Sequence, residues 1–144
     1  MKLLYILPLL LLPLFAQASD HSAGHGEIKA EILAQSGHSW DGTKLPAYPS
    51  EDPEITVLKV TVPPGAKLGW HRHPSINVGY MVSGELVVFA EGGQKMPLKA
   101  GDPLIELVDT WHYGQNTGDV PAEIVVVYIG VEGRPLSIMK DGDL

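Results

Sequence analysis

Three histidines are spaced so that they could bind one metal ion. His71 and His73 are separated by one residue, in a segment whose β-branched neighbours and Gly and Pro residues argue against a helix. Residues two apart in a strand point to the same face, so both imidazoles would face one way. His112 follows the turn at Gly101-Asp102 and offers a third ligand. Imidazoles suit Fe, Cu, Ni and Zn, and ligands from non-adjacent strands leave coordination positions open, so the pattern predicts a reactive metal site.

The segments around these histidines have the composition of short strands. Val and Ile alternate with other residues, and Gly or Pro stands at nearly every break. Ser83-Gly84 has the composition of a hairpin turn between two of these strands. Strands at short intervals with turns between them predict an all-β fold of the barrel or jelly-roll type. The expected strands are residues 55–62, 67–73, 76–82, 85–90, 94–98, 103–108, 111–115 and 122–129, with a last one at 136–140.

Residues 19–53 are expected to form an N-terminal arm and a covering segment ahead of a barrel domain at 54–144. Residues 19–26 are small and polar, as in a flexible arm, and 27–35 fit either a helical turn or an edge strand. Residues 36–53 have loop chemistry, with aromatic anchors that include Trp40 and Tyr48 and would cover one face of the barrel. His38 is expected to be a surface histidine.

Residues 1–18 have the three parts of a cleaved secretory signal peptide. Lys2 gives the positive start, residues 3–15 are apolar but interrupted by prolines, and Ala16-Gln17-Ala18 is a small-x-small cleavage site. The apolar run is shorter than the roughly 20 residues of a spanning helix. We therefore expect a periplasmic or secreted protein without a membrane anchor after cleavage. The chain has no cysteine, so no disulfide is expected.

Cleavage after Ala18 would create a second candidate metal site at the new N-terminus, Ser19-Asp20-His21. A free amine with histidine in third place can surround Cu(II) or Ni(II) with nitrogens in a plane. The alternative is a solvated tail that happens to contain a histidine.

The net charge of the chain is −7, with 10 Lys and Arg against 17 Asp and Glu. Binding to nucleic acid depends on Lys and Arg that release counterions from phosphate, and binding to anionic lipid needs a basic patch. The chain has no basic cluster, so a small molecule is the expected partner.

The spacing of glycines and histidines resembles the two motifs of the cupin superfamily. The matching positions of the first motif are Gly65, His71, His73 and Gly84, and those of the second are Gly101, His112 and Asn116. Three positions depart from the family pattern. Asn77 stands where a glutamate ligand is usual, and Leu107 and Asp109 stand where a proline and a glycine are usual.

The resemblance implies a single double-stranded β-helix, or jelly-roll barrel, with one divalent transition metal (Fe, Ni, Cu, Mn or Zn) held by His71, His73 and His112. The alternative is a barrel that has lost its metal and keeps the histidines hydrogen-bonded. Three neutral ligands would leave the charge of the ion uncompensated, which favours an anionic substrate. Asn77 would be a weak fourth ligand or would orient a water.

Other polar and aromatic residues near the histidines are expected to have structural rather than catalytic roles. Glu85 and Glu106 are expected at the surface or at a sheet edge, and Arg72 in a structural ion pair. Aromatic residues that flank the histidines are expected to lie mostly in the core or the pocket lining: Trp70, Tyr80, Trp111 and Tyr113.

Three functions remain open. The resemblance suggests a metal-dependent oxidoreductase, such as a dioxygenase of a small anionic, enol or phenol compound. The first alternative is a non-catalytic cupin that binds a metal or small ligand, and the second is a sugar-acid isomerase. A homodimer is the default expectation for the assembly.

Overall fold

The computed structural model describes residues 27–142. The predicted signal peptide and the Ser19-Asp20-His21 site lie outside the described residues. The chain divides into two units, Met1–Ala30 and Glu31–Leu144, and all strands of the described part lie in the second. No helix in the described range is long and apolar enough to cross a bilayer.

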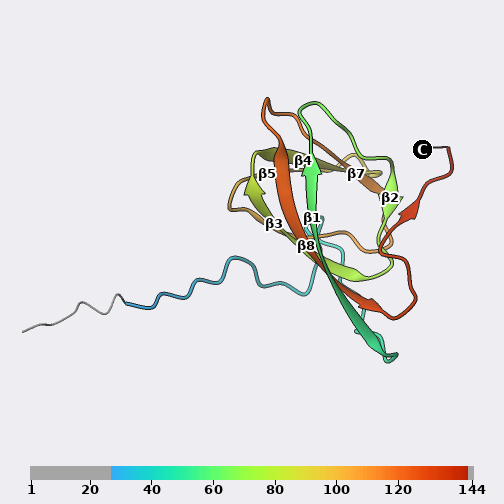
Figure 1. The fold of residues 1–144 in the computed structure, drawn as a ribbon. Coiled ribbons are helices and arrows are strands. Elements are labelled where there is room, and N and C mark those ends of the chain that lie inside the picture. Colours follow the sequence, from blue (N-terminus) through green and yellow to red (C-terminus); the bar gives the residue numbers. More distant parts are fainter. Residues whose placement is uncertain (1–26, 143–144) are drawn as a thin grey trace, which may run out of the picture. The chain divides into compact units, whose positions relative to one another are not determined.

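Two antiparallel sheets form the second unit, which confirms the all-β prediction. The four-stranded sheet has the order β1-β8-β3-β6 and the five-stranded sheet the order β5-β4-β7-β2-β9. Figure 1 shows the long strands β1 and β8 side by side, as their ten-residue register requires. The strands are β1 Pro53–Val62, β2 His71–Arg72, β3 Ile76–Ser83, β4 Glu85–Ala90, β5 Lys95–Lys99, β6 Pro103–Ile105, β7 His112–Gln115, β8 Ala122–Val131 and β9 Ile138–Met139.

The hydrophobic core contains side chains from both sheets. Met81 of β3 is fully buried, and it clusters with Leu86 of β4 and Ile124 of β8. The alternation of buried and exposed residues along β3 and β4 has the period of two that the sequence showed. Asn116, the last residue of the second motif, is buried, and its Nδ2 donates to Val62 O and Val120 O, both at 2.8 Å. It therefore joins the connections that follow β1 and β7.

The hairpin expected at Ser83-Gly84 is wrong, because β3 and β4 belong to different sheets. The two residues carry the chain from one sheet to the other, and β4 pairs instead with β5. Gly84 has φ of +71°, and a Cβ there would lie 2.6 Å from Pro121 O and 2.8 Å from Ala122 Cα. Glycine is therefore needed for both its backbone angle and the close approach of the segment before β8.

Two strands near the histidines are shorter than expected. The segment predicted as 67–73 is strand only at β2, and β6 ends at Ile105 rather than at residue 108. Beyond β6, Asp109 has φ of +51°, a left-handed conformation at a position where the cupin motif has glycine. Its carboxylate pairs with Arg72 at 3.3 Å, so the ion pair expected for Arg72 is present.

The segment before β1 is anchored by Trp40. Residues 27–35 form neither a helical turn nor a strand. Trp40 is half-buried and packs against the core, as expected for an anchor, whereas Tyr48 is 74% exposed and the anchor role predicted for it is wrong. His38 is exposed, as expected.

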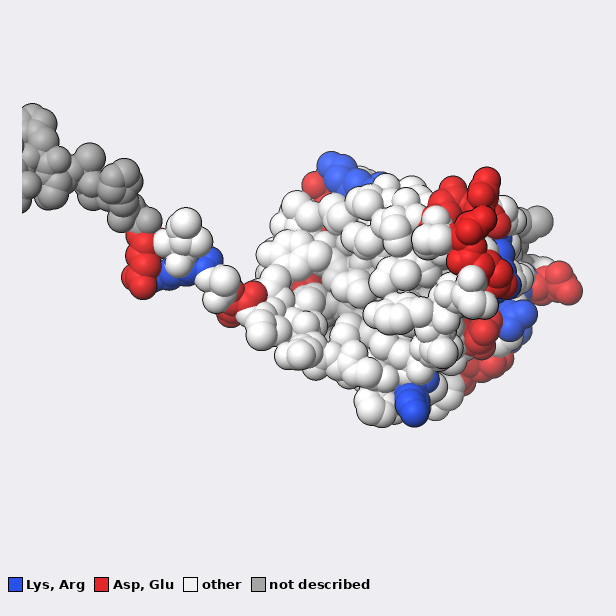
Figure 2. Space-filling model, turned by 90° about the horizontal axis from the view of Figure 1, so that it is seen from below, with Lys and Arg blue, Asp and Glu red and all other residues white. Residues whose placement is uncertain are grey.

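Charged side chains are unevenly distributed on the face seen in Figure 2. Most of this face is free of charge, and Asp and Glu gather at one border with some Lys and Arg among them. Apolar side chains are exposed on strands β1 and β3 of the four-stranded sheet, among them Ile55 and Val57 of β1 and Tyr80 and Val82 of β3. The expected homodimer stays a prediction.

Replacing Gly84 with alanine should destabilise the protein more than the same change at Gly93. Both glycines have positive φ, so each alanine costs about 1–2 kcal/mol of backbone strain. Only Gly84 faces a backbone clash, which adds about 1–3 kcal/mol, since Gly93 has nothing within 4 Å of an added Cβ. Urea denaturation of the two variants measures the difference. Equal losses of unfolding free energy in the two variants would show that the backbone near Pro121 moves away from the added Cβ without cost.

Candidate metal centre

Two of the three histidines lie on neighbouring strands of the five-stranded sheet, and the third directly follows one of these strands. His71 of β2 pairs directly with His112 of β7, and His73 follows β2 and forms a bridge to Val108. The expectation of ligands from non-adjacent strands is therefore wrong. The strands are distant in sequence but adjacent in the sheet, so the register of β2 against β7 itself brings two imidazoles together.

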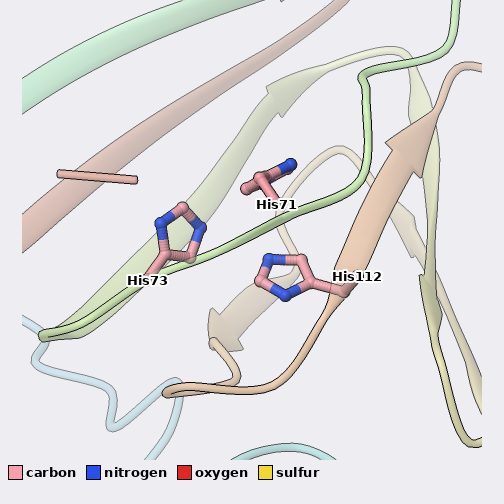
Figure 3. Close-up of side chains that lie close together, drawn as sticks. All are labelled: His71, His73 and His112. Atoms are coloured by element: carbon pink, nitrogen blue, oxygen red, sulfur yellow. The ribbon is translucent and has the colours of Figure 1, made fainter. Parts of the chain in front are cut away.

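The imidazoles of His71, His73 and His112 converge on one point. Their ring centroids are 5.0, 4.6 and 4.9 Å apart, and one nitrogen from each lies within 4.8 Å of the other two. Figure 3 shows the three rings grouped around a common space, with His112 reaching in from its own strand. His73 and His112 are buried, and His71 is half-buried.

Each imidazole is oriented by a hydrogen bond to a backbone carbonyl. Nδ1 of His71 lies 2.7 Å from Gly69 O, Nδ1 of His73 2.9 Å from Leu136 O, and Nδ1 of His112 2.8 Å from Thr110 O. A carbonyl oxygen only accepts, so Nδ1 carries the proton in each ring and Nε2 keeps its lone pair. The three rings thus share the tautomer that a metal bound through Nε2 requires.

Burial keeps these rings neutral. Desolvation lowers the pKa of His71 and of His112, and it lowers the pKa of His73 to about 3. Near neutral pH all three are therefore uncharged, as metal ligands must be.

The arrangement fits a divalent transition metal. Nε2 of His112 is buried and has no hydrogen-bond partner, which is unfavourable for a polar atom unless something binds it. Three neutral imidazole nitrogens are a donor set for Fe, Ni, Cu or Zn. The structure brings together all three predicted ligands, and the metal itself stays a prediction.

Asn77 and Tyr128 face the histidines from the four-stranded sheet. They are partners in the register of β3 against β8, and both line the cavity next to the imidazoles. Asn77 Nδ2 donates to Ser75 O at 3.4 Å, a long contact, so the amide oxygen remains for a water or ligand. Burial raises the pKa of Tyr128 to about 12, so its hydroxyl stays protonated. Tyr128 was not among the site residues predicted from the sequence, although alternation along its strand places it on the inner face with Ile124.

Glu106 is buried in the site, so its expected place at the surface is wrong, although it follows the edge strand β6. Its side chain is 9% exposed, and Oε2 lies 3.8 Å from Nε2 of His112. Burial raises the pKa of Glu106, while hydrogen bonds from Leu107 N and Trp40 Nε1 act in the opposite direction. Strand periodicity could have found it, since Glu106 is two residues from buried Leu104. Glu85 is exposed, as expected.

The histidines line a cavity of about 70 Å³. Its polar lining consists of the three imidazoles, Asn77, Glu106 and Tyr128, and the remaining lining residues are aliphatic or glycine. The aliphatic residues include Val60, Leu68, Leu86, Leu104, Ile124 and Val126. The site therefore suits a small molecule with a polar end and an apolar remainder.

The aromatic residues that flank the histidines in sequence lie outside the cavity. Trp70 and Tyr113 pack edge to face with centroids 4.7 Å apart, and Lys67 lies over the Tyr113 ring at 4.0 Å. Trp111 is stacked beneath Arg72, and Tyr80 is 42% exposed. None of the four lines the cavity. The expected core or pocket role is wrong for them. Three of them adjoin an inward histidine and so point outward in an extended chain, whereas Tyr80 lies on the exposed face of β3.

Comparison with known proteins identifies one family. Residues 58–128 match the family model described as "Cupin domain". An oxalate-binding protein of Thermotoga maritima is 33% identical over 72 residues, which is 49% of this chain and 59% of that protein. The Oryzines biosynthesis cluster protein J of Aspergillus oryzae is 29% identical over 82 residues, 57% of this chain and 45% of that protein. The chain thus spans about half the length of the curated relatives it matches.

Solved structures share the fold. A cupin-like protein of Thermotoga maritima has a TM-score of 0.55 and 22% identity, covering 60% of this chain and 64% of that one. A DMSP lyase of Ruegeria pomeroyi has a TM-score of 0.53 and 22% identity, covering 60% and 43%. At this identity the likeness concerns the fold alone.

Stability of the metal-free protein should fall as the pH drops from about 6.5 to about 3. In this window an unfolded histidine, with its pKa of 6.5, binds a proton that folded His73 does not, so protonation favours the unfolded state. The slope from one such group is about 1.4 kcal/mol per pH unit. Denaturation of chelator-treated protein across this range, compared with His73→Gln, measures the contribution. A variant with the same slope as the original protein would contradict the assignment of a depressed pKa to His73.

Proposed function

Because this chain belongs to the cupin superfamily, we propose that it is a metal-dependent oxidoreductase, dioxygenase-like in its reaction, acting on a small anionic, enol or phenol compound. One observation carries the proposal. Three neutral imidazoles with free nitrogens converge in a cavity whose other lining residues are mostly aliphatic. Such a site holds a reactive ion and a small amphipathic molecule side by side.

The proposed ligands of the ion are Nε2 of His71, His73 and His112. A bound divalent metal would supply Lewis-acid polarisation of a substrate oxygen and, for iron or copper, redox chemistry. The protein would hold the three rings in one tautomer through the backbone carbonyls of Gly69, Leu136 and Thr110.

The remaining residues of the cavity would orient the substrate. The protonated Tyr128 hydroxyl is a hydrogen-bond donor, and the Asn77 amide oxygen can accept from a hydroxyl or water. Aliphatic side chains such as Leu68 and Val126 would enclose the apolar part and keep bulk water out.

A non-catalytic binding protein is the second candidate, and the name of the Thermotoga maritima relative, oxalate-binding protein, favours it. The cavity lining includes neither Lys nor Arg, so an anion such as oxalate would depend on the bound ion for its positive partner. The largely aliphatic wall also offers few partners for the hydroxyls of a sugar acid, which disfavours an isomerase.

Loss of one histidine should remove both metal and turnover. His71→Ala is expected to lose the bound ion, because two imidazoles retain a divalent metal far less well than three. Elemental analysis of protein from its native compartment and oxygen uptake with enol, catechol and thiol panels measure both properties. His38→Ala is the matched control, since His38 is exposed and outside the site.

The outcomes separate the two candidates. Oxygen uptake that depends on His71 supports the oxidoreductase. Metal retained tightly without turnover on any panel member would overturn it in favour of metal binding. Protein without stoichiometric metal would reject the oxidoreductase and leave binding of a small ligand as the second candidate.

Export is proposed from residues 1–18 alone. Intact-mass measurement of protein recovered from outside the cytoplasm should give a chain that begins at Ser19. A chain that keeps Met1, or protein found only in the cytoplasm, would contradict export. A different first residue would rule out the copper or nickel site at Ser19-Asp20-His21.

A further inference from the structure

Glu106 is a carboxylate in surroundings where a carboxylate is costly. The residue is 7% exposed, and its Oε1 accepts hydrogen bonds from Leu107 N at 2.8 Å and Trp40 Nε1 at 3.1 Å. Among the described residues Glu106 forms no ion pair with Lys or Arg. Its only contact with a side chain that can carry positive charge is with His112, whose Nε2 lies 3.8 Å from Oε2. That distance is too long for a hydrogen bond. A buried carboxylate is unfavourable unless it is protonated or a cation binds beside it, so Oε2 is available to a cation next to His112.

Glu106 is also the cross-strand neighbour of Asn77. Its backbone N–H donates to Asn77 O at 3.1 Å, and both side chains line the cavity that contains the histidines. Side chains paired across strands have Cβ atoms roughly 4.5–5.5 Å apart. A carboxylate at position 106 therefore reaches nearly the same space as a carboxylate at position 77.

The segment before the barrel fixes Glu106 from outside. Ser39 Oγ donates to Glu106 O at 2.9 Å, and Trp40 N donates to Ile105 O at 3.0 Å. With the indole hydrogen bond to Oε1, three contacts from two adjacent residues hold this position. They leave Oε2 as the free carboxylate oxygen, on the side of His112.

We propose that Glu106 is the anionic group of the metal centre and that Trp40 is its positioning residue. Glu106 would replace the glutamate ligand that the family pattern has at the position of Asn77. The inference rests on the metal site proposed above. It also changes the expected charge, because one carboxylate beside the ion reduces its net charge from +2 to +1.

Cobalt(II) titration followed by visible absorption tests the proposal without any substrate. Glu106→Gln keeps the shape and both acceptor contacts at the amide oxygen but removes the charge. It should weaken Co²⁺ binding by about 10–100-fold, the usual effect of losing a partner that supports a metal site. Glu85→Gln is the matched control, since Glu85 is exposed and contacts Thr117 rather than the cavity.

A carboxylate introduced at position 77 should restore the Co²⁺ affinity that Glu106→Gln loses. Asn77→Glu in the Glu106→Gln background is expected to recover most of the Co²⁺ affinity, because the carboxylate returns to the neighbouring strand position. A purely structural role for Glu106 would not produce this recovery. Circular dichroism checks that each variant is folded.

Trp40→Phe tests the positioning role. It keeps the packing of the ring but removes the donor to Oε1, so Co²⁺ binding should weaken, by less than in Glu106→Gln. In the Glu106→Gln background the same change should have little further effect on affinity, because the two residues act through one carboxylate. Additive losses would reject the positioning role.

The results distinguish this inference from the metal site itself. If Glu106→Gln binds Co²⁺ within twofold of the original protein while His71→Ala does not bind it, the metal site stands and the role of Glu106 is overturned. If the original protein does not bind Co²⁺, the metal site fails and the inference fails with it.

Discussion

Hydrogen bonds from three imidazoles to backbone carbonyls determine what the cavity can do. Two of these carbonyls, of Gly69 and Thr110, belong to residues two positions before the histidine they orient, so local backbone shape fixes His71 and His112. The third, of Leu136, lies 63 residues after His73 and reaches it because β9 pairs with β2. The site is therefore complete only when the C-terminal segment has docked.

The two sheets contribute different chemistry to one interior. The five-stranded sheet supplies the imidazoles, and β3 and β8 of the other sheet supply Asn77 and Tyr128. Aliphatic residues from both sheets separate these groups from water. The burial that stabilises the fold also keeps the imidazoles neutral. Core packing and the protonation state of the ligands therefore both depend on the exclusion of water from the cavity.

Sequence periodicity predicted the parts that depend on local pattern. It placed β1, β3, β4 and β8 nearly where they lie, and the spacing of the motifs identified the three histidines that converge. It did not predict which strands pair, because the passage of Ser83-Gly84 between sheets is decided by tertiary packing. Glu106 was assigned by residue type rather than by the face shared with Leu104. The same oversight placed Trp70 inside, although its neighbour His71 points inward.

The contact between Trp40 and Glu106 joins the cavity to a part of the chain that precedes the matched cupin region at 58–128. A carboxylate inside the barrel is thus oriented by a loop that is not part of the barrel. Loops before a domain tolerate substitution and insertion more readily than its strands. Substitutions in this loop could therefore change the chemistry of the metal centre during evolution while every strand and histidine stayed the same. Relatives that share the three histidines but differ ahead of the barrel need not share a reaction.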